Sequence, residues 1–106
     1  MANVLLVSFT IHWGQDDDAY DQIYEDLNTA LQTAPVSKYW CETTSFYCVQ
    51  TTENSRELVS RLVSTSGLRS SKDRLLVVDA NVKTGTAWGN IRDADLYALL
   101  PFVKKL

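Results

Sequence analysis

Four aspartates near the N-terminus form the densest group of potential metal ligands in the chain: Asp16, Asp17, Asp18 and Asp21. Carboxylate oxygens are preferred ligands of hard cations such as magnesium and calcium. Carboxylates at the start of a helix also accept hydrogen bonds from its free N–H groups and interact favourably with the helix dipole. We interpret these aspartates as a solvated helix cap, so the sequence predicts no metal site and no bound cofactor.

The histidine and the two cysteines do not form a catalytic motif. His12 is the only histidine; it could act as a general base beside a cleft, but we interpret it as a partly exposed residue at the end of a strand. Cys41 and Cys48 lack the spacing of a metal site, and we interpret them as small buried side chains that stay reduced. Without a phosphate loop, a nucleophile elbow or a Cys–His signature, the sequence predicts no catalytic residue.

Aromatic and basic residues are the remaining candidates for binding. Trp13 and Trp88 fall in predicted loops, where they could stack on bases or pack at a protein interface. Basic residues are not interleaved with them, so we favour an interface. The best basic cluster, a candidate nucleic-acid contact that a solvated loop would also explain, consists of Arg69, Lys72 and Arg74.

The composition is ordinary for a single globular domain. The chain has 106 residues and a net charge of -3, which argues against binding nucleic acid through phosphate neutralisation alone, although a dimer could still create a local basic patch. No apolar run approaches the roughly 20 residues of a membrane helix. The start, Met-Ala-Asn, lacks the features of a signal peptide, so we expect a cytoplasmic protein.

The hydrophobic pattern predicts the order strand, helix, strand, strand, helix, strand. These elements are a strand at residues 4–11, an amphipathic helix from residue 19 that ends before Pro35, a hairpin at 38–51 with Cys41 opposite Cys48, a helix that begins with an Asn54–Glu57 capping box, and a strand at 75–78. A short C-terminal helix, broken at Pro101, is predicted from the leucines at 96, 99 and 100 and from Val103.

This order predicts an α+β fold of the ferredoxin-like βαββαβ type, with a four-stranded antiparallel sheet and two helices on one face. Residues 1–84 would form this domain, and residues 85–106 would be an extension that contributes to a dimer. Val4 and Leu6 would then lie on the uncovered face, and a large exposed apolar patch usually marks an interface. We therefore expect a homodimer through that face or through the C-terminal segment, with Trp88 packed near Leu96 and Leu99.

Several segments resemble the small Cas-two-like proteins often called SinR-like. The resemblance covers most of the chain and includes SFYCVQT at 45–51, the helix at 55–62, DRLLVV at 73–78, the first strand with its glycine loop at 4–15, and TAWG at 86–89. These proteins are relatives of the CRISPR adaptation nuclease, and the resemblance implies a ferredoxin-like fold and a homodimer.

The resemblance also bears on catalysis. Family members with nuclease activity are expected to carry an aspartate after an aromatic residue at the end of the first strand, where it holds a divalent metal across the dimer. The matching pair here is Phe9–Thr10, and threonine is a poor magnesium ligand. We therefore expect a non-catalytic dimeric binding module in a mobile-element or defence context, with a protein partner. Two alternatives stay open: a metal-dependent endonuclease acting on RNA or DNA, and a phage-encoded inhibitor that mimics nucleic acid.

Overall fold

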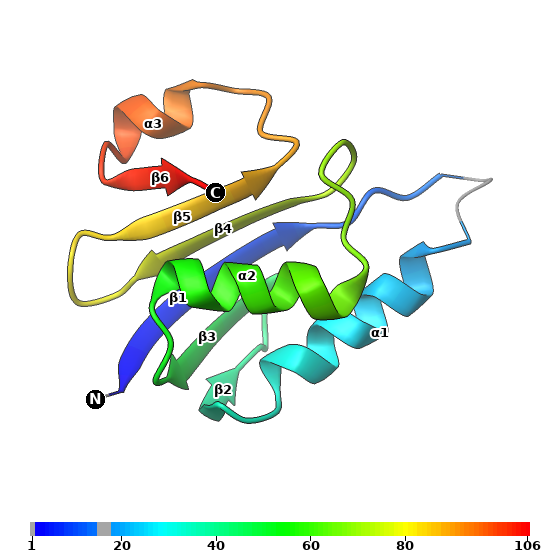
Figure 1. The fold of residues 1–106 in the computed structure, drawn as a ribbon, viewed down its shortest axis with the longest axis horizontal. Coiled ribbons are helices and arrows are strands. Elements are labelled where there is room, and N and C mark those ends of the chain that lie inside the picture. The colour runs from blue at the N-terminus through cyan, green and yellow to red at the C-terminus, as the bar shows by residue number, and fades with distance from the viewer. Residues whose placement is uncertain (1, 15–17) are drawn as a thin grey trace.

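Within residues 2–14 and 18–106, which the computed structural model describes, six strands form one mixed sheet and three helices accompany it (Figure 1). The strands are β1 (Asn3–Thr10), β2 (Val36–Trp40), β3 (Phe46–Thr51), β4 (Arg74–Asp79), β5 (Gly85–Gly89) and β6 (Val103–Lys105), and the helices are α1 (Tyr20–Leu31), α2 (Ser55–Ser66) and α3 (Asp95–Leu99). The predicted α+β class is confirmed, whereas the prediction of only four strands is wrong.

The strand β1 lies in the middle of the sheet, whose order is β2-β3-β1-β4-β5-β6. It pairs with β3 on one side and β4 on the other, and both pairs are antiparallel. Its alternating residues Leu5, Val7 and Phe9 are buried in the core, while Ser8 and Thr10 are exposed. Val4 and Leu6 alternate with these buried residues and are only partly buried, so they point to the other face of the sheet, as predicted.

Helices α1 and α2 lie against each other on the same side of the sheet (Figure 1). The buried stripe of α1 consists of Ile23, Leu27, Ala30 and Leu31, at the spacing of three and four that an amphipathic helix requires. Ala19, rather than an aspartate, occupies the N-cap position of α1. Asp16 and Asp17 lie outside the described residues, so the predicted aspartate cap is tested only in part.

The predicted capping box at the start of α2 is confirmed. The backbone N–H of Glu57 donates to the Asn54 side chain over 2.8 Å, and the backbone N–H of Asn54 donates to the Glu57 carboxylate over 3.0 Å. Gly67 ends the helix in the left-handed conformation, with φ of 66°, as glycine does most readily.

The predicted hairpin register is wrong by one residue. Cys48 pairs with Trp40 rather than with Cys41, and Cys41 lies exposed beyond the end of β2. The turn places Ser45 in the left-handed region, with φ of 54°. This conformation is uncommon for residues other than glycine. The residue types in the turn therefore did not predict it, and the register could not be predicted from them. The interpretation of both cysteines as buried is also wrong, because Cys41 is exposed and Cys48 is only partly buried.

The C-terminal segment departs most from its prediction. α3 ends before Pro101, and Val103 lies in β6, which pairs in parallel with β5. The sheet is thus not antiparallel throughout. Gly85 permits this pairing, because a Cβ atom there would lie 3.1 Å from Val103 and 3.0 Å from the Val77 carbonyl oxygen. Residues 85–106 therefore extend the sheet of their own chain; their contribution to a dimer stays a prediction.

We predict that Gly89→Ala lowers the free energy of unfolding by about 2 kcal/mol or more. Gly89 has φ of 94°, and an added Cβ would lie 2.1 Å from the carbonyl oxygen of Asp73. Urea denaturation measures the change. Gly14→Ala is the matched control, because within the described part of the chain its Cβ would meet only His12, at 3.6 Å. If both variants lose the same free energy of unfolding, the close approach of Gly89 to the Asp73 carbonyl oxygen is contradicted.

Candidate functional site

The basic cluster predicted from the sequence does not form one cationic surface. Arg69 donates from its Nε to the Asp73 carboxylate over 3.1 Å and from a terminal nitrogen to the His12 carbonyl oxygen over 3.2 Å. Arg74 is partly buried, and Lys72 is exposed. Arg69 thus pairs with the fully buried carboxylate of Asp73 and also bonds the segment that follows β1. Because its guanidinium is used in these contacts, Arg69 is a poor candidate for contacting nucleic acid.

Asp73 joins the loop after β1 to the loop before β4. Its carboxylate accepts hydrogen bonds from the backbone N–H groups of His12 and Arg69, each over 2.8 Å. Burial alone raises the pKa of Asp73, but the hydrogen bonds from the Arg69 side chain and from these two N–H groups outweigh it. The net pKa of Asp73 is therefore lower than that of an ordinary aspartate, and its charged form stabilises the fold.

The uncovered face of the sheet carries a continuous set of partly exposed apolar side chains, which we call the open face. Leu6 lies at its centre, between Cys48 on β3 and Val78 on β4. The open-face residues of the three central strands are Val4, Leu6, Ser8 and Thr10 on β1, Phe46, Cys48 and Gln50 on β3, and Arg74, Leu76 and Val78 on β4. Arg74 is the only charged residue among these ten.

A hollow of about 370 Å³ opens on the β2 side of the sheet. The Trp40 ring forms one wall, is 44% exposed, and donates from its indole nitrogen to Glu42 over 3.1 Å. The lining residues are Val4, Lys38, Tyr39, Trp40, Cys48, Val49 and Gln50. The hollow thus continues the apolar character of the open face toward the edge of the sheet.

The other residues predicted at an interface lie apart from one another. Trp13 follows β1 and is 66% exposed, and Leu99 on α3 is 77% exposed, whereas Leu96 is partly buried. Trp88 pairs with Leu75 and packs against the core of its own chain. The prediction that Trp88 falls in a loop is therefore wrong, because it lies in β5. Its contact with a second chain stays a prediction.

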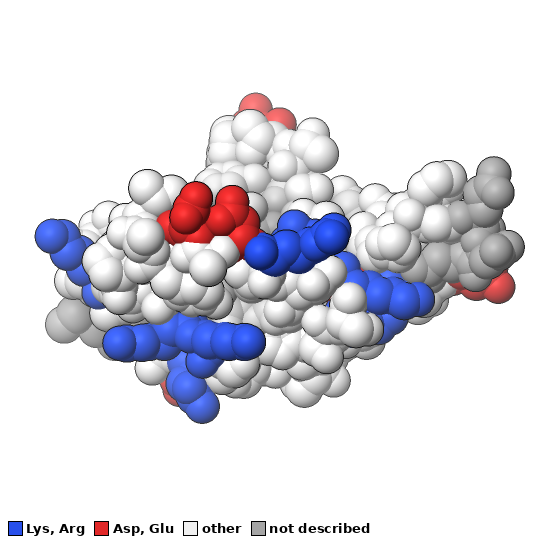
Figure 2. Space-filling model, turned by 90° about the horizontal axis from the view of Figure 1, so that it is seen from above, with Lys and Arg blue, Asp and Glu red and all other residues white. Residues whose placement is uncertain are grey.

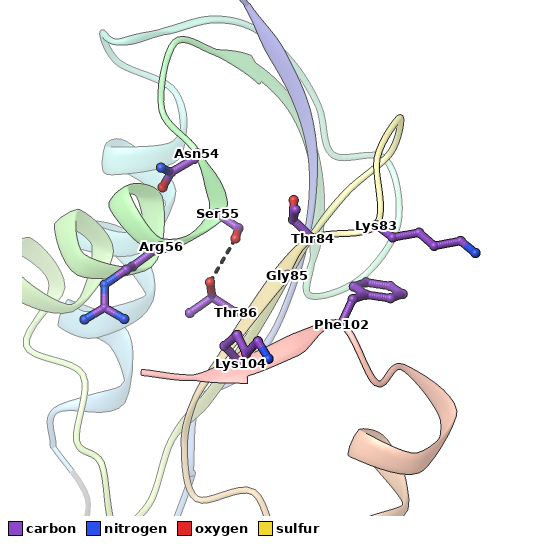
Figure 3. A pocket seen from close by; sticks show the side chains of 9 residues that line it. All are labelled: Asn54, Ser55, Arg56, Lys83, Thr84, Gly85, Thr86, Phe102 and Lys104. Carbon is purple, nitrogen blue, oxygen red and sulfur yellow. Dashed lines mark hydrogen bonds between the residues drawn. The ribbon is translucent and has the colours of Figure 1, made fainter.

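A groove of about 540 Å³ lies where the start of α2 meets β5 and β6 (Figure 3). The hydroxyls of Ser55 and Thr86, 2.8 Å apart, share a hydrogen bond that joins the helix to the sheet. The lining residues are Asn54, Ser55, Arg56, Lys83, Thr84, Gly85, Thr86, Phe102 and Lys104. This set contains three cations and no carboxylate. Because these residues come from segments far apart in the sequence, no motif predicted the groove.

Charges of both signs are mixed on the face seen from above in Figure 2, where acidic side chains lie between separate basic groups. This face therefore presents no broad acidic surface. Thr10 is exposed at the end of β1, opposite Arg74. Among residues 2–14 and 18–106, no three His, Cys, Asp or Glu side chains gather in a way that could hold a metal ion.

Comparison with known proteins gives no match: no family model, no curated protein and no solved structure is similar enough to this chain to assign a family. Of the helices in the described residues, none combines the length and the apolar character needed to cross a membrane. The function is therefore inferred from this chain's own geometry.

We predict that Asp73→Asn lowers the free energy of unfolding at neutral pH by about 2–3 kcal/mol, because it removes a buried charge that is paired and hydrogen-bonded. A lowered pKa stabilises the folded state at neutral pH, and this contribution disappears as the pH falls from the unfolded value of about 3.9 through the folded one. The difference in free energy of unfolding between wild type and Asp73→Asn should therefore become smaller at acidic pH. Urea denaturation at several pH values measures this difference, with a substitution of an exposed residue, Glu25→Gln, as control. A difference that does not change with pH would contradict this role for Asp73.

Proposed function

We propose that the protein is a non-catalytic, dimeric binding module of the Cas-two-like type, with a ferredoxin-like core formed by β1 to β4, α1 and α2. The strand order β2-β3-β1-β4, with antiparallel pairs throughout these four strands, supports this assignment, because it is the order that a split βαβ arrangement gives. The segment from β5 to β6 is then an addition to that core. We place the protein in the cytoplasm, where its cysteines stay reduced.

The observation that carries the proposal is the open face. It is broad, centred on β1, and holds one charged residue among the ten on its central strands. A second copy of the chain is the occupant that fits it best. Two-fold packing sets the same apolar residues against each other, and a nearly uncharged patch lets two chains of net charge -3 associate with little repulsion.

The proposal that the dimer is non-catalytic depends on Thr10. This residue occupies the position at which a nuclease of the family is expected to hold its metal, and it offers a hydroxyl instead of a carboxylate. A two-fold dimer through the open face would therefore bring two threonines, rather than two aspartates, to matching ends of the paired sheets. The module would act by binding a partner in a mobile-element or defence context.

We predict that Leu6→Glu weakens dimerisation at least about tenfold, because it introduces two like charges into the centre of an apolar interface. Size-exclusion chromatography with light scattering measures the dissociation, and far-ultraviolet circular dichroism checks that the fold is kept. Leu6→Thr, which retains β propensity, is a milder variant and should weaken the dimer in the same direction.

Leu99→Glu serves as the control for the interface, because Leu99 lies on α3 and is 77% exposed. The open face predicts that this variant remains dimeric. If Leu99→Glu dissociates the dimer and Leu6→Glu does not, the interface lies in the C-terminal segment and not on the open face. A wild-type protein that is monomeric at all concentrations would overturn the dimer altogether.

We further predict that the purified protein does not cleave RNA or DNA in the presence of magnesium or manganese. Thr10 supplies no carboxylate for a divalent metal. Incubation with single- and double-stranded substrates, with and without a chelator, measures cleavage. Chelator-sensitive cleavage that persists through stringent purification would contradict the non-catalytic proposal and favour the endonuclease alternative.

A further inference from the structure

We propose that the groove at the start of α2 binds a nucleotide, with its phosphate between Arg56 and Lys104 and its base against Phe102. This proposal does not depend on the open face, because it concerns a different surface of the same chain. The nucleotide is either a free mononucleotide or the phosphorylated end of a single-stranded nucleic acid, since both present the same phosphate and base.

The phosphate end of the groove combines positive charge with hydroxyl groups. Arg56 and Lys104 line the groove together with the hydrogen-bonded pair of Ser55 and Thr86, and Figure 3 shows the Arg56 side chain extending to the side opposite Lys83 and Phe102. A guanidinium binds phosphate through two parallel N–H groups, and an ammonium adds a compact charge. The two hydroxyls offer additional hydrogen-bonding positions, and the lining residues include no carboxylate that would repel an anion.

Among residues 2–14 and 18–106, the cations of the groove have no counter-ion. In the described part of the chain, neither of the two ion pairs found involves Arg56, Lys83 or Lys104. All three side chains are exposed, so they can move toward an anion. A ligand phosphate would relieve the repulsion among them, which is a specific reason for an anion to bind at this place on a protein with net charge -3.

The capping box at the start of α2 engages the backbone N–H groups of Asn54 and Glu57. Arg56 and Lys104 add full positive charges to this end of the groove, so substitution of either residue should weaken the binding of an anion.

The opposite end of the groove suits an aromatic base. Phe102 is partly buried, so its ring is held by the fold while one part stays accessible, and Figure 3 shows it projecting to the same side as Lys83. Stacking on an aromatic ring tolerates any base. The groove volume of about 540 Å³ lies within the range of small-molecule sites. The site is thus large enough for a mononucleotide.

Isothermal titration calorimetry with adenosine monophosphate, adenosine and inorganic phosphate tests the proposal. We expect the monophosphate to bind more tightly than either fragment, because it contacts both ends of the groove. Binding that weakens as salt is added is also expected, since screening reduces the attraction of exposed charges. Failure of the monophosphate and of a phosphorylated oligonucleotide to bind would overturn the proposal.

Single substitutions then separate the two ends. Arg56→Gln and Lys104→Gln should each weaken binding of the monophosphate about tenfold and leave adenosine unaffected. Phe102→Leu, which keeps the apolar volume, should weaken the monophosphate and adenosine alike. Arg92→Gln removes the same charge from an exposed residue outside the groove and is the matched control. Equal weakening by Arg92→Gln, or no effect of Arg56→Gln, would overturn the site.

A short single-stranded oligonucleotide with and without a 5′-phosphate distinguishes the two sources of the ligand. Tighter binding of the phosphorylated oligonucleotide than of the monophosphate assigns the groove to the end of a nucleic acid. Tighter binding of the monophosphate assigns it to a free nucleotide. Both results support the groove as a nucleotide site, and equal binding of the oligonucleotide with and without its 5′-phosphate contradicts it.

Discussion

The burial of one face of β1 is the constraint on which the rest of the structure depends. Leu5 and Val7 are fully buried, and Phe9 is nearly so. The two neighbouring strands are antiparallel to β1, and α1 and α2 cover this face. Removal of this apolar area from water is the main force that stabilises the sheet. Since side chains of a strand alternate, the same pairing also fixes which residues face away from the helices.

The two surfaces that we connect with function follow from this arrangement in different ways. The open face exists because both long helices pack on the other side of the sheet, leaving Leu6 and Val78 without a helical cover. The groove exists because α2 begins next to β5, where the Ser55 and Thr86 hydroxyls share a hydrogen bond. The pairing of β6 with β5 adds its other side. One surface is therefore apolar and central, whereas the other is cationic and lies toward the edge of the sheet.

The sequence predicted the elements whose signals are local and repeated. The period of two in β1, the stripe of α1, and the capping box at Asn54 required only neighbouring residues to recognise. The hairpin register depended on the left-handed conformation of Ser45, which its residue type does not favour. The parallel pairing of β6 depended on a close approach at Gly85, and short apolar stretches near Pro101 gave no indication of it.

The candidate sites show the same limit. Val4 and Leu6 were placed on the uncovered face because alternation alone assigns them there. Arg69 looked accessible in the sequence, but its partner is Asp73, which is completely buried. Arg56 and Lys104 come together only when α2 and β6 pack on β5, so no spacing along the chain reveals them.

The central claim, that the open face joins two copies of the chain, is tested most directly by methyl nuclear magnetic resonance during dilution. We expect the methyl signals of Val4, Leu6 and Val78 to shift together as the dimer dissociates, while the buried Leu27 signal stays unchanged. Signals that are independent of concentration in a monomeric protein, or shifts confined to Leu96 and Leu99, would contradict the claim.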